Sequence, residues 1–265
     1  MLDQITPLIL TFNEAPNIGR TLARLSWARD IVVVDSLSSD ETRAIASRYP
    51  AVRFFERPFT THAEQWTFGM EQTAIRTDWV LALDADFVLT EELIAEITAL
   101  SPPPNAGGYR ASFTYCIDGT PLRSAVYPPV TVLFRRALAK YRQDGHTQRV
   151  HLDGTVLALS SRIQHDDRKP LSHWLAAQVK YMRLEAEKLA TAPAASLGLV
   201  DRVRRWVVIA PPLMFLHCLF VRGGIFDGWP GLYYALQRAT AELILSLSLA
   251  ERFVMGRRPD GRPSH

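Results

Sequence analysis

Residues 5–35 read ITPLILTFNEAPNIGRTLARLSWARDIVVVD, and this stretch contains one complete strand–helix–strand unit. The apolar run Ile5–Leu10 is followed by Asn17–Trp27, whose apolar residues recur at helical spacing. The block Ile31–Val34 is wholly apolar and β-branched, which is typical of a strand buried in a parallel sheet. The stretch therefore predicts two parallel strands joined by a helix.

The same alternation of strands and helices continues along the chain. We expect helices over residues 38–49, 62–75 and 90–100, and strands over residues 52–56, 79–83, 109–116, 130–134 and 155–160. Alternation of this kind predicts an α/β fold with a Rossmann-like, mostly parallel central sheet and flanking helices. In such folds, ligands bind at the carboxyl ends of the strands.

The composition is that of a folded protein and excludes several classes. The chain has 265 residues, of which 48% are hydrophobic and 22% charged, so it can bury a large core and is not disordered. Cys116 and Cys218 lie far apart without C-x-x-C spacing, which predicts buried free thiols rather than a disulfide or zinc framework. The net charge of +3 arises from 30 basic and 27 acidic residues without a basic tract, so we expect no nucleic-acid partner.

Long helical stretches replace the alternating pattern after residue 170. We therefore predict an α/β domain over residues 1–170 and an apolar, basic helical extension over residues 171–265, with helices at 174–189 and 232–253. Residues 201–265 hold nine Arg and no Lys against five acids, whereas the rest of the chain carries a net charge of −1. The positive excess thus belongs to the extension alone.

The most apolar window of the chain, residues 206–221, lies in this extension. It reads WVVIAPPLMFLHCLFV, which is shorter than the roughly 20 residues that a membrane-spanning helix needs and contains two prolines. Arginines beside an apolar face favour a segment, residues 202–254, that lies on an anionic membrane surface. A buried helix hairpin or a homodimer interface is the alternative. Because Met1–Gln4 does not begin a secretory signal, we expect a cytoplasmic protein, peripheral on the inner face of the cytoplasmic membrane.

Two carboxylates, Asp84 and Asp86, directly follow the apolar strand predicted over residues 79–83. At positions i and i+2, where a strand ends in a loop, both can reach one divalent cation, which prefers oxygen ligands and often bridges to substrate phosphates. Asp35 and Glu14 also follow predicted strands. Acidic residues gathered at one sheet edge favour a site for a nucleotide diphosphate and its metal over solvated loop acids.

These motifs resemble the successive signatures of family 2 glycosyltransferases with the GT-A fold. The matching segments are Thr11-Phe-Asn-Glu14, Ile31-Val-Val-Val-Asp35-Ser-Leu-Ser-Ser-Asp40-Glu-Thr42 and Asp78-Trp-Val-Leu-Ala-Leu-Asp84-Ala-Asp86. The apolar helical C-terminus, with Phe226-Asp-Gly228, is similar more loosely to the lipopolysaccharide-core subgroup of glucosyltransferase-like enzymes. The resemblance implies transfer of a sugar from a nucleotide diphosphate donor, most often a UDP-sugar, to an acceptor hydroxyl, with Mg²⁺ or Mn²⁺ as cofactor.

The resemblance also implies a role for each matching residue. The backbone around Thr11 and the side chain of Glu14 would contact the nucleotide, and Asp35 would contact the base or ribose. Asp84 would lie near the ribose and diphosphate, and Asp86 would ligate the metal directly.

A second group of candidates lies in Gln164-His-Asp-Asp-Arg-Lys169. His165 is similar in position to the histidine that reaches the metal or the diphosphate in many GT-A enzymes. Arg168 and Lys169 could neutralise the diphosphate as it leaves. The alternative is a solvated polar turn before Pro170.

The general base is the least clear assignment. An inverting transfer needs a carboxylate or imidazole within hydrogen-bond reach of the acceptor hydroxyl. The related subgroup commonly has a His-Glu pair where this chain has Thr147-Gln148, and Gln148 cannot act as a base. Asp144 is therefore the first candidate and His146 the second, although either can equally be a turn residue.

Together these features and the resemblance predict a metal-dependent glycosyltransferase, and the resemblance implies that it inverts the anomeric configuration. Its acceptor would be a lipid-linked or lipopolysaccharide-type glycan at the inner membrane face. Two alternatives stay open. A nucleotidyltransferase of similar fold also uses a metal-binding acidic pair, and a non-catalytic membrane-surface module descended from a transferase would tolerate Gln148.

Overall fold

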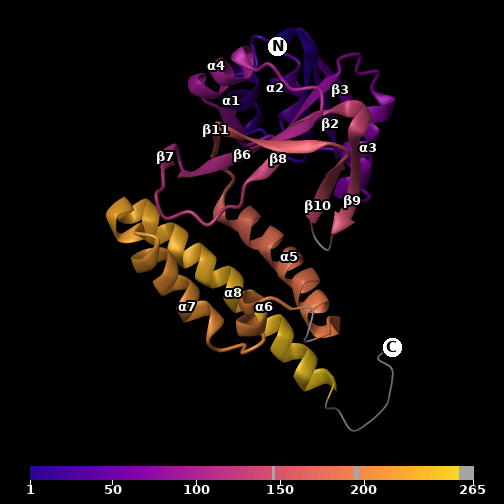
Figure 1. The fold of residues 1–265 in the computed structure, drawn as a ribbon. Coiled ribbons are helices and arrows are strands. Elements are labelled where there is room, and N and C mark those ends of the chain that lie inside the picture. Colours follow the sequence, from indigo (N-terminus) through magenta and orange to yellow (C-terminus); the bar gives the residue numbers. More distant parts are fainter. Residues whose placement is uncertain (145–146, 194–196, 257–265) are drawn as a thin grey trace. The chain divides into compact units, whose positions relative to one another are not determined.

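The computed structural model describes residues 1–144, 147–193 and 197–256 (Figure 1). The chain forms two compact units. The first, called here the sheet unit, comprises Met1–Pro121 and Val126–Lys169. The second, called the helical unit, comprises Leu122–Ala125 and the chain from Pro170 onward.

The sheet unit is built on a sheet that has nine strands among the described residues. Its order is β3-β2-β1-β4-β8-β6-β11-β5, and β7 pairs with β6 beside this path. The strands are β1 (Ile5–Thr11), β2 (Ile31–Asp35), β3 (Val52–Glu56), β4 (Trp79–Asp84), β5 (Phe87–Leu89), β6 (Ala106–Ile117), β7 (Thr120–Pro121), β8 (Val130–Arg135) and β11 (Thr155–His165).

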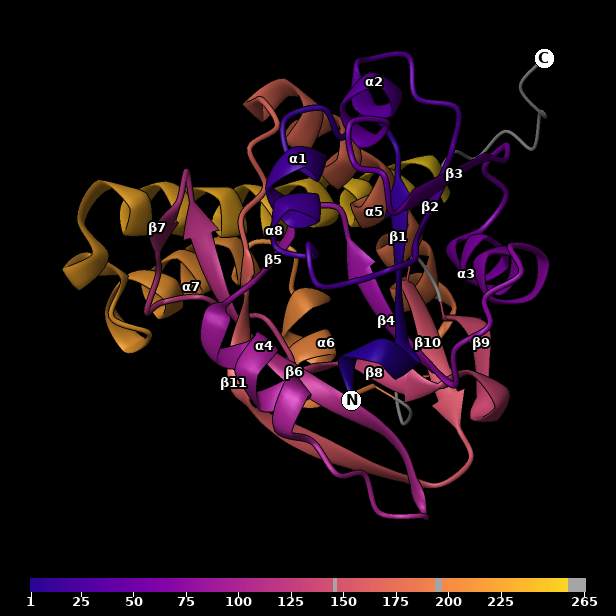
Figure 2. The same ribbon diagram turned by 90° about the horizontal axis from the view of Figure 1, so that it is seen from above.

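The first four strands of the sheet run parallel, as the alternation predicts. β1 lies between β2 and β4, and its register pairs Thr11 with Asp35 and Leu10 with Asp84 (Figure 2). Beyond β4 the sheet is mixed, because β8 runs antiparallel to both β4 and β6, and β5 antiparallel to β11. The register brings the carboxyl ends of β1, β2 and β4 to one edge of the sheet.

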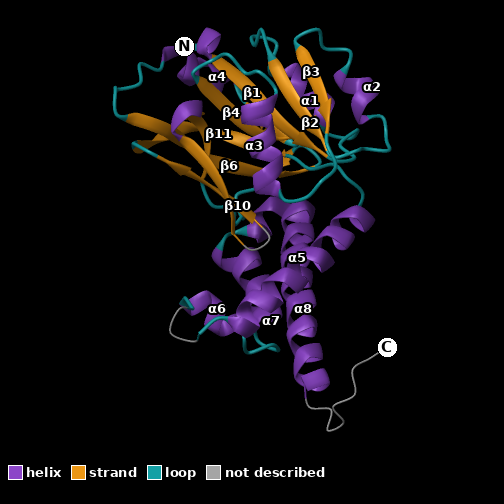
Figure 3. Cartoon of the chain, turned by 90° about the vertical axis from the view of Figure 1, so that its right-hand side faces the viewer, coloured by secondary structure: helices purple, strands orange, loops and turns teal. Residues whose placement is uncertain are grey.

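Helices cover both faces of the sheet (Figure 3). Because side chains alternate along a strand, Ile9 of β1 packs with Leu22 on one face, and Leu8 packs with Trp66 on the other. The helices of this unit are α1 (Ile18–Ala23), α2 (Thr42–Ala46), α3 (His62–Gln72) and α4 (Glu91–Ala99). The residues of α1, α2 and α4 join the first face, and those of α3 join the second.

The helix predicted over residues 38–49 was wrong at both ends, because α2 spans only Thr42–Ala46. Leu37, directly before the predicted segment, has a positive φ of 63°, which lies outside the right-handed helical region. Ser38 Oγ accepts from the Asn13 amide of the first loop at 2.7 Å. Asp40 accepts from the Ala15 amide of that loop and from the Thr42 amide at the start of α2, both at 3.0 Å. Residues 36–41 therefore form a loop beside the end of β1.

A separate two-stranded hairpin, which the sequence analysis does not predict, consists of β9 (Ala139–Asp144) and β10 (Thr147–Leu152). Its strands are antiparallel, with Asp144 opposite Thr147. Tyr141 of β9 stacks on Trp66 of α3, with ring centroids 5.4 Å apart. The hairpin thus adds to the core on the α3 side of the sheet.

The helical unit contains the two long helices expected from the sequence, and both extend beyond the predicted ends (Figure 1). α5 is Leu171–Thr191, and α8 is Gly228–Gly256, with the shorter α6 (Leu199–Arg204) and α7 (Ala210–Leu216) packed beside them. Arg204 of α6 makes a bidentate ion pair with the buried Glu242 of α8, with a closest N–O distance of 2.7 Å. This pair joins two elements of the unit.

Many apolar side chains of the helical unit face solvent. Several of them are more than half exposed, among them Trp206, Val208, Phe220, Val221, Phe226 and Trp229. Among the helices that the structure describes, none is both long enough and apolar enough to cross a membrane. Cys218 in this unit and Cys116 in the sheet unit are buried free thiols, as the sequence predicts.

Candidate active site

The acidic pair, Asp84 and Asp86, lies where β4 ends at the carboxyl edge of the sheet. His165 is the last residue of β11, and its register sets it opposite Phe87, the first residue of β5. As a result, His165 Nε2 lies 3.0 Å from Asp86 Oδ2, although the two residues are 79 positions apart in the chain. The structure therefore brings both predicted metal ligands together.

The second polar atom of each partner has no hydrogen bond within the described residues. Asp86 Oδ1 and His165 Nδ1 are both buried without a partner. Buried polar atoms normally find a partner, so an orphaned carboxylate oxygen beside an imidazole at a substrate edge fits a bound cation. Within the described residues no three His, Cys, Asp or Glu side chains converge as a complete metal site.

The two carboxylates differ in their electrostatics. Burial, helped by the Asp86 charge, raises the pKa of Asp84 to about 6. Burial alone would also raise the pKa of Asp86, but the His165 imidazole and the Lys169 ammonium outweigh it and lower this pKa. The pKa of His165 is raised, because Asp86 and Asp84 outweigh its burial. Asp86 is therefore the carboxylate that carries its charge most readily.

Three aromatic rings enclose His165, and the sequence analysis did not single them out. The ring centroids of Tyr115 and Tyr127 both lie 4.8 Å from that of His165, and the centroid of Phe87 lies 5.2 Å away. Burial and the nearby acidic pair raise the pKa of Tyr127. The three rings restrict the orientations open to the imidazole.

Glu14 and Lys169 form a second pair at this edge. Lys169 Nζ donates to Glu14 Oε1, and each side chain is only 13% exposed. Burial raises the pKa of Glu14 to about 7, although Lys169 acts in the opposite direction. Burial alone would lower the pKa of Lys169, but the carboxylates of Glu14 and Asp167 outweigh it and raise this pKa. The ammonium of Lys169 is thus held charged near the acidic pair.

Asp35 and Thr11 bond to each other at the ends of their strands. Thr11 Oγ1 donates to Asp35 Oδ1 at 2.7 Å, while the amide and hydroxyl of Ser38 donate to the two oxygens of Asp35 at 2.7 and 2.6 Å. Asp35 is only 1% exposed. The Asp35 carboxylate therefore holds the loop after β2 in place through these hydrogen bonds.

Arg168 points elsewhere than expected from its place beside Lys169. Its guanidinium makes two contacts of 2.9 Å with Asp166 Oδ2 and lies 3.6 Å from Asp118 Oδ1. Its ion pairs do not include the acidic pair. Among the basic residues predicted for the diphosphate, Lys169 is the one that the structure sets close to Asp86.

Of the two candidates for the general base, the structure describes only the backbone of Asp144. Asp144 is the last residue of β9. His146 lies outside the described residues. The assignment of the base stays a prediction.

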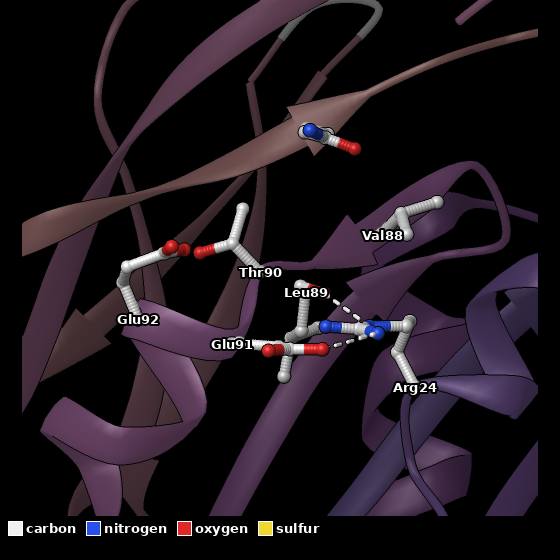
Figure 4. Close-up of a pocket in the computed structure, with 7 residues that line it drawn as sticks. Arg24, Val88, Leu89, Thr90, Glu91 and Glu92 are labelled. Carbon is white, nitrogen blue, oxygen red and sulfur yellow. Dashed lines mark hydrogen bonds and ion pairs between the residues drawn. The ribbon is translucent and has the colours of Figure 1, made fainter.

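A pocket in the sheet unit lies apart from this edge (Figure 4). Its lining residues are Arg24, Val88, Leu89, Thr90, Glu91, Glu92 and Gln164. Gln164 and His165 are neighbours on β11, so their side chains project to opposite faces of the strand. Arg24 donates hydrogen bonds to Leu89 O at 2.8 Å and to Glu91 Oε1 at 3.5 Å. The negative charges of the two acids in the first turn of α4, Glu91 and Glu92, disfavour an anionic ligand in this pocket.

A parallel sheet with an acidic pair at its carboxyl edge is typical of α/β enzymes that bind nucleotides. Residues 8–156, more than half of the chain, match the family model described as Glycosyl transferase family 2, and the chain belongs to this family. It is a glycosyltransferase with the GT-A fold, which confirms the resemblance seen in the three sequence motifs.

Individual relatives agree with this assignment. The chain is 26% identical to the lipopolysaccharide core biosynthesis glycosyltransferase LpsC of Rhizobium meliloti, over 97% of this chain and 95% of LpsC. It is 31% identical to an uncharacterised glycosyltransferase of Rickettsia bellii, over 52% of this chain and 48% of that protein. The crystal structure of S. aureus TarS 1–349 in complex with UDP-GlcNAc has a TM-score of 0.50 at 14% identity, and the match covers 97% of this chain and 93% of that one.

Proposed function

We propose that this glycosyltransferase is metal-dependent and inverting, and that it moves a sugar from a nucleotide diphosphate donor, with UDP-sugars favoured. Its proposed acceptor is a lipid-linked or lipopolysaccharide-type cell-surface glycan. The observation that carries the donor site is the contact of 3.0 Å between Asp86 and His165, with an unpartnered buried atom on each side chain. The name of LpsC, to which the chain is similar over nearly its whole length, supports the acceptor class.

The donor set fits Mg²⁺ or Mn²⁺. Asp86 Oδ1 and a ring nitrogen of His165 would hold the cation, and the donor's phosphates and water would complete its shell, as hard divalent cations commonly require. When bound, such a cation supplies positive charge that stabilises a departing diphosphate. His165 would have to lose the proton that its acidic neighbours favour before its nitrogen could ligate.

The neighbouring side chains have distinct proposed roles. Lys169 contributes a buried positive charge near the diphosphate, where a fixed cation is effective because little water screens it. Asp84 lies near the ribose and diphosphate, and Glu14 holds Lys169 at the nucleotide. Asp35 acts on the base or ribose through the loop that it fixes together with Thr11. Arg168, paired with Asp166, is better suited to holding the loop than to meeting the donor.

The acceptor side is proposed to lie towards the hairpin. Asp144 remains the first candidate for the base that deprotonates the acceptor hydroxyl, and His146 the second. An attack on the anomeric carbon from the side opposite the diphosphate is what inversion requires.

We also propose that residues 171–265 act as a membrane-associating region beside a catalytic domain at residues 1–170. Within it, residues 202–254 combine exposed aromatic side chains with arginines, a composition that suits anionic lipid headgroups. The protein would then be cytoplasmic and peripheral on the inner face of the membrane. A homodimer that buries the same apolar surface is the competing arrangement.

The test is a transfer assay with a panel of nucleotide sugars and extracted glycolipid acceptors, scored by product. We expect release of free nucleoside diphosphate, and we expect Asp86→Ala to lower transfer at least about a hundredfold while thermal unfolding stays close to the wild type. The exposed Asp153→Ala is the matched control and should retain activity. Release of pyrophosphate would indicate a nucleotidyltransferase, and full activity of Asp86→Ala would remove its metal role.

A further inference from the structure

Asn17, directly before α1, is completely buried, and its side-chain amide makes four hydrogen bonds. Asn17 Nδ2 donates to Glu14 Oε2 at 2.9 Å and to Asp167 Oδ1 at 2.8 Å. Asn17 Oδ1 accepts from Arg20 Nη2 at 2.7 Å and from the Arg168 amide at 2.9 Å. A primary amide has two donors and two acceptor positions, so its hydrogen-bonding capacity is fully used.

These bonds close a ring around the Glu14–Lys169 pair. The Asp167 carboxylate accepts from Asn17 Nδ2 and from the Lys169 amide, the latter at 3.0 Å. Lys169 Nζ in turn donates to Glu14, and Glu14 accepts from Asn17 Nδ2, which closes the ring. The ring joins two segments that are about 150 residues apart in the chain. Every member other than Asn17 has an ionisable side chain.

Only a neutral amide suits the centre of this ring. Two carboxylates, those of Glu14 and Asp167, approach the same nitrogen, and each needs a donor because a buried carboxylate without one is costly. An aspartate of the same shape would offer no donor and would add a third negative charge. An alanine would leave both carboxylates short of one hydrogen bond.

We propose that Asn17 is a positioning residue for the donor: it fixes Glu14 and the 166–169 loop so that the Lys169 ammonium is directed towards the donor's diphosphate. The inference rests on the proposed function in one respect, namely that Lys169 meets the diphosphate. Asn17 itself does not touch the donor in this proposal. Its effect on binding passes through Lys169.

The probe is UDP with Mn²⁺, measured by calorimetric titration of the full chain. We expect Asn17→Ala to weaken binding by about tenfold or more, since two hydrogen bonds to charged groups are lost. The control is Thr73→Val, which removes a buried hydrogen bond of 2.6 Å to Gly69 O, away from the site. Both variants should lose thermal stability, but Thr73→Val should bind UDP as the wild type does.

A double-mutant cycle separates positioning from a general loss of structure. Lys169→Met alone should weaken UDP binding. Adding Asn17→Ala to it should change the affinity by less than about twofold, because the ammonium through which Asn17 acts on UDP is already absent. Equal factors for Asn17→Ala in both backgrounds would overturn the inference. If Lys169→Met binds UDP normally, the proposed role of Lys169 fails, and the inference about Asn17 fails with it. If Lys169→Met weakens binding but Asn17→Ala does not, only the inference about Asn17 fails.

Asn17→Asp provides a second route should the alanine variant not fold. The variant keeps the shape of the side chain, and we expect weaker UDP binding than in the wild type, because the added carboxylate repels Glu14 and Asp167 and competes for Lys169. Wild-type affinity for UDP in a folded Asn17→Asp protein would contradict the inference. Restored affinity on returning the amide in an Asp167→Asn, Asn17→Asp exchange would support it.

Discussion

Individual residues at the carboxyl edge owe their properties to their partners rather than to their type. Asp84 and Asp86 are two positions apart, yet the pKa of Asp84 is raised to about 6 while that of Asp86 is lowered. The difference arises because only Asp86 bonds to His165. Opposite shifts in neighbouring carboxylates are common where an enzyme needs two roles from one motif.

Glu14 gives a pH-dependent prediction at the same scale. Its pKa is raised from 4.5 to about 7 in the folded protein, so it contributes stability below pH 4.5 that is lost as the pH rises through 7. Glu14→Gln cannot titrate, so the wild type should lose up to about 3 kcal/mol of unfolding free energy relative to this variant between pH 4.5 and 8. Urea unfolding of both proteins across this range, without metal, measures the difference. A difference that is constant, or that grows in favour of the wild type, would contradict the pKa of Glu14.

Sequence motifs predicted which residues meet at the edge only where a strand end fixed them. The positions of Asp84 and Asp86 follow from the end of the parallel strand β4, whereas His165 was a candidate through the family resemblance alone. Tyr127 and Asn17 were missed, because their contacts depend on how loops far apart in the chain fold against each other. The spacing of Asp84 and Asp86 carries no information about these loops.

The length of one strand, β11, determines whether His165 reaches the candidate active site. β11 was expected to end at residue 160, but it continues to His165, because its last residues pair with β6 on one side and β5 on the other. Such pairing joins residues more than 40 positions apart and leaves no mark in the local pattern. The additional residues of β11 place the His165 imidazole beside Asp86.

The exposed aromatic residues of the helical unit give a prediction about its elements. Phe226, in the short 3-10 helix before α8, and Trp229, in the first turn of α8, are 78% and 82% exposed. Replacing both with serine should weaken cosedimentation with vesicles of phosphatidylglycerol and phosphatidylcholine by at least about tenfold, since burial of each side chain contributes about 1.5–3 kcal/mol. Wild-type binding should also decrease with added salt.

The control for this experiment is Val156→Ser, which changes an apolar side chain of the sheet unit that is 40% exposed. It should bind vesicles as the wild type does. Absence of vesicle binding by the wild type, together with a dimer that the double serine variant dissociates, would replace the membrane proposal by a homodimer interface.

The whole molecule combines two parts with different charge. The family model matches residues 8–156, whereas the similarity to LpsC covers 97% of the chain and so includes most of the helical unit. Residues 201–265 carry nine Arg against five acids, and the remainder of the chain is slightly acidic. This distribution of charge supports the proposal above, in which the donor binds with a cation at the acidic edge and the basic helical region lies on an anionic membrane.

The amino-acid pattern predicts the first half of the sheet well and its second half poorly. Strands β1 to β4 alternate with helices, so short right-handed connections leave few arrangements. The order β8-β6-β11-β5 mixes parallel and antiparallel pairs and is set by long-range register instead. The periodicity predicts the long helices of the helical unit. It does not predict the ion pair of Arg204 with Glu242, which joins α6 to α8.

The most direct test of the central claim is donor binding with and without metal. Thermal unfolding of the wild type should shift upward with UDP-sugars in the presence of Mn²⁺ and remain unchanged when EDTA replaces the metal, because a ligand stabilises only the state that binds it. Asp86→Asn should lose the shift, while the control Asp153→Asn should keep it. Equal stabilisation of the wild type and Asp86→Asn by the same UDP-sugar, with or without Mn²⁺, would contradict a metal-dependent donor site at Asp86 and His165.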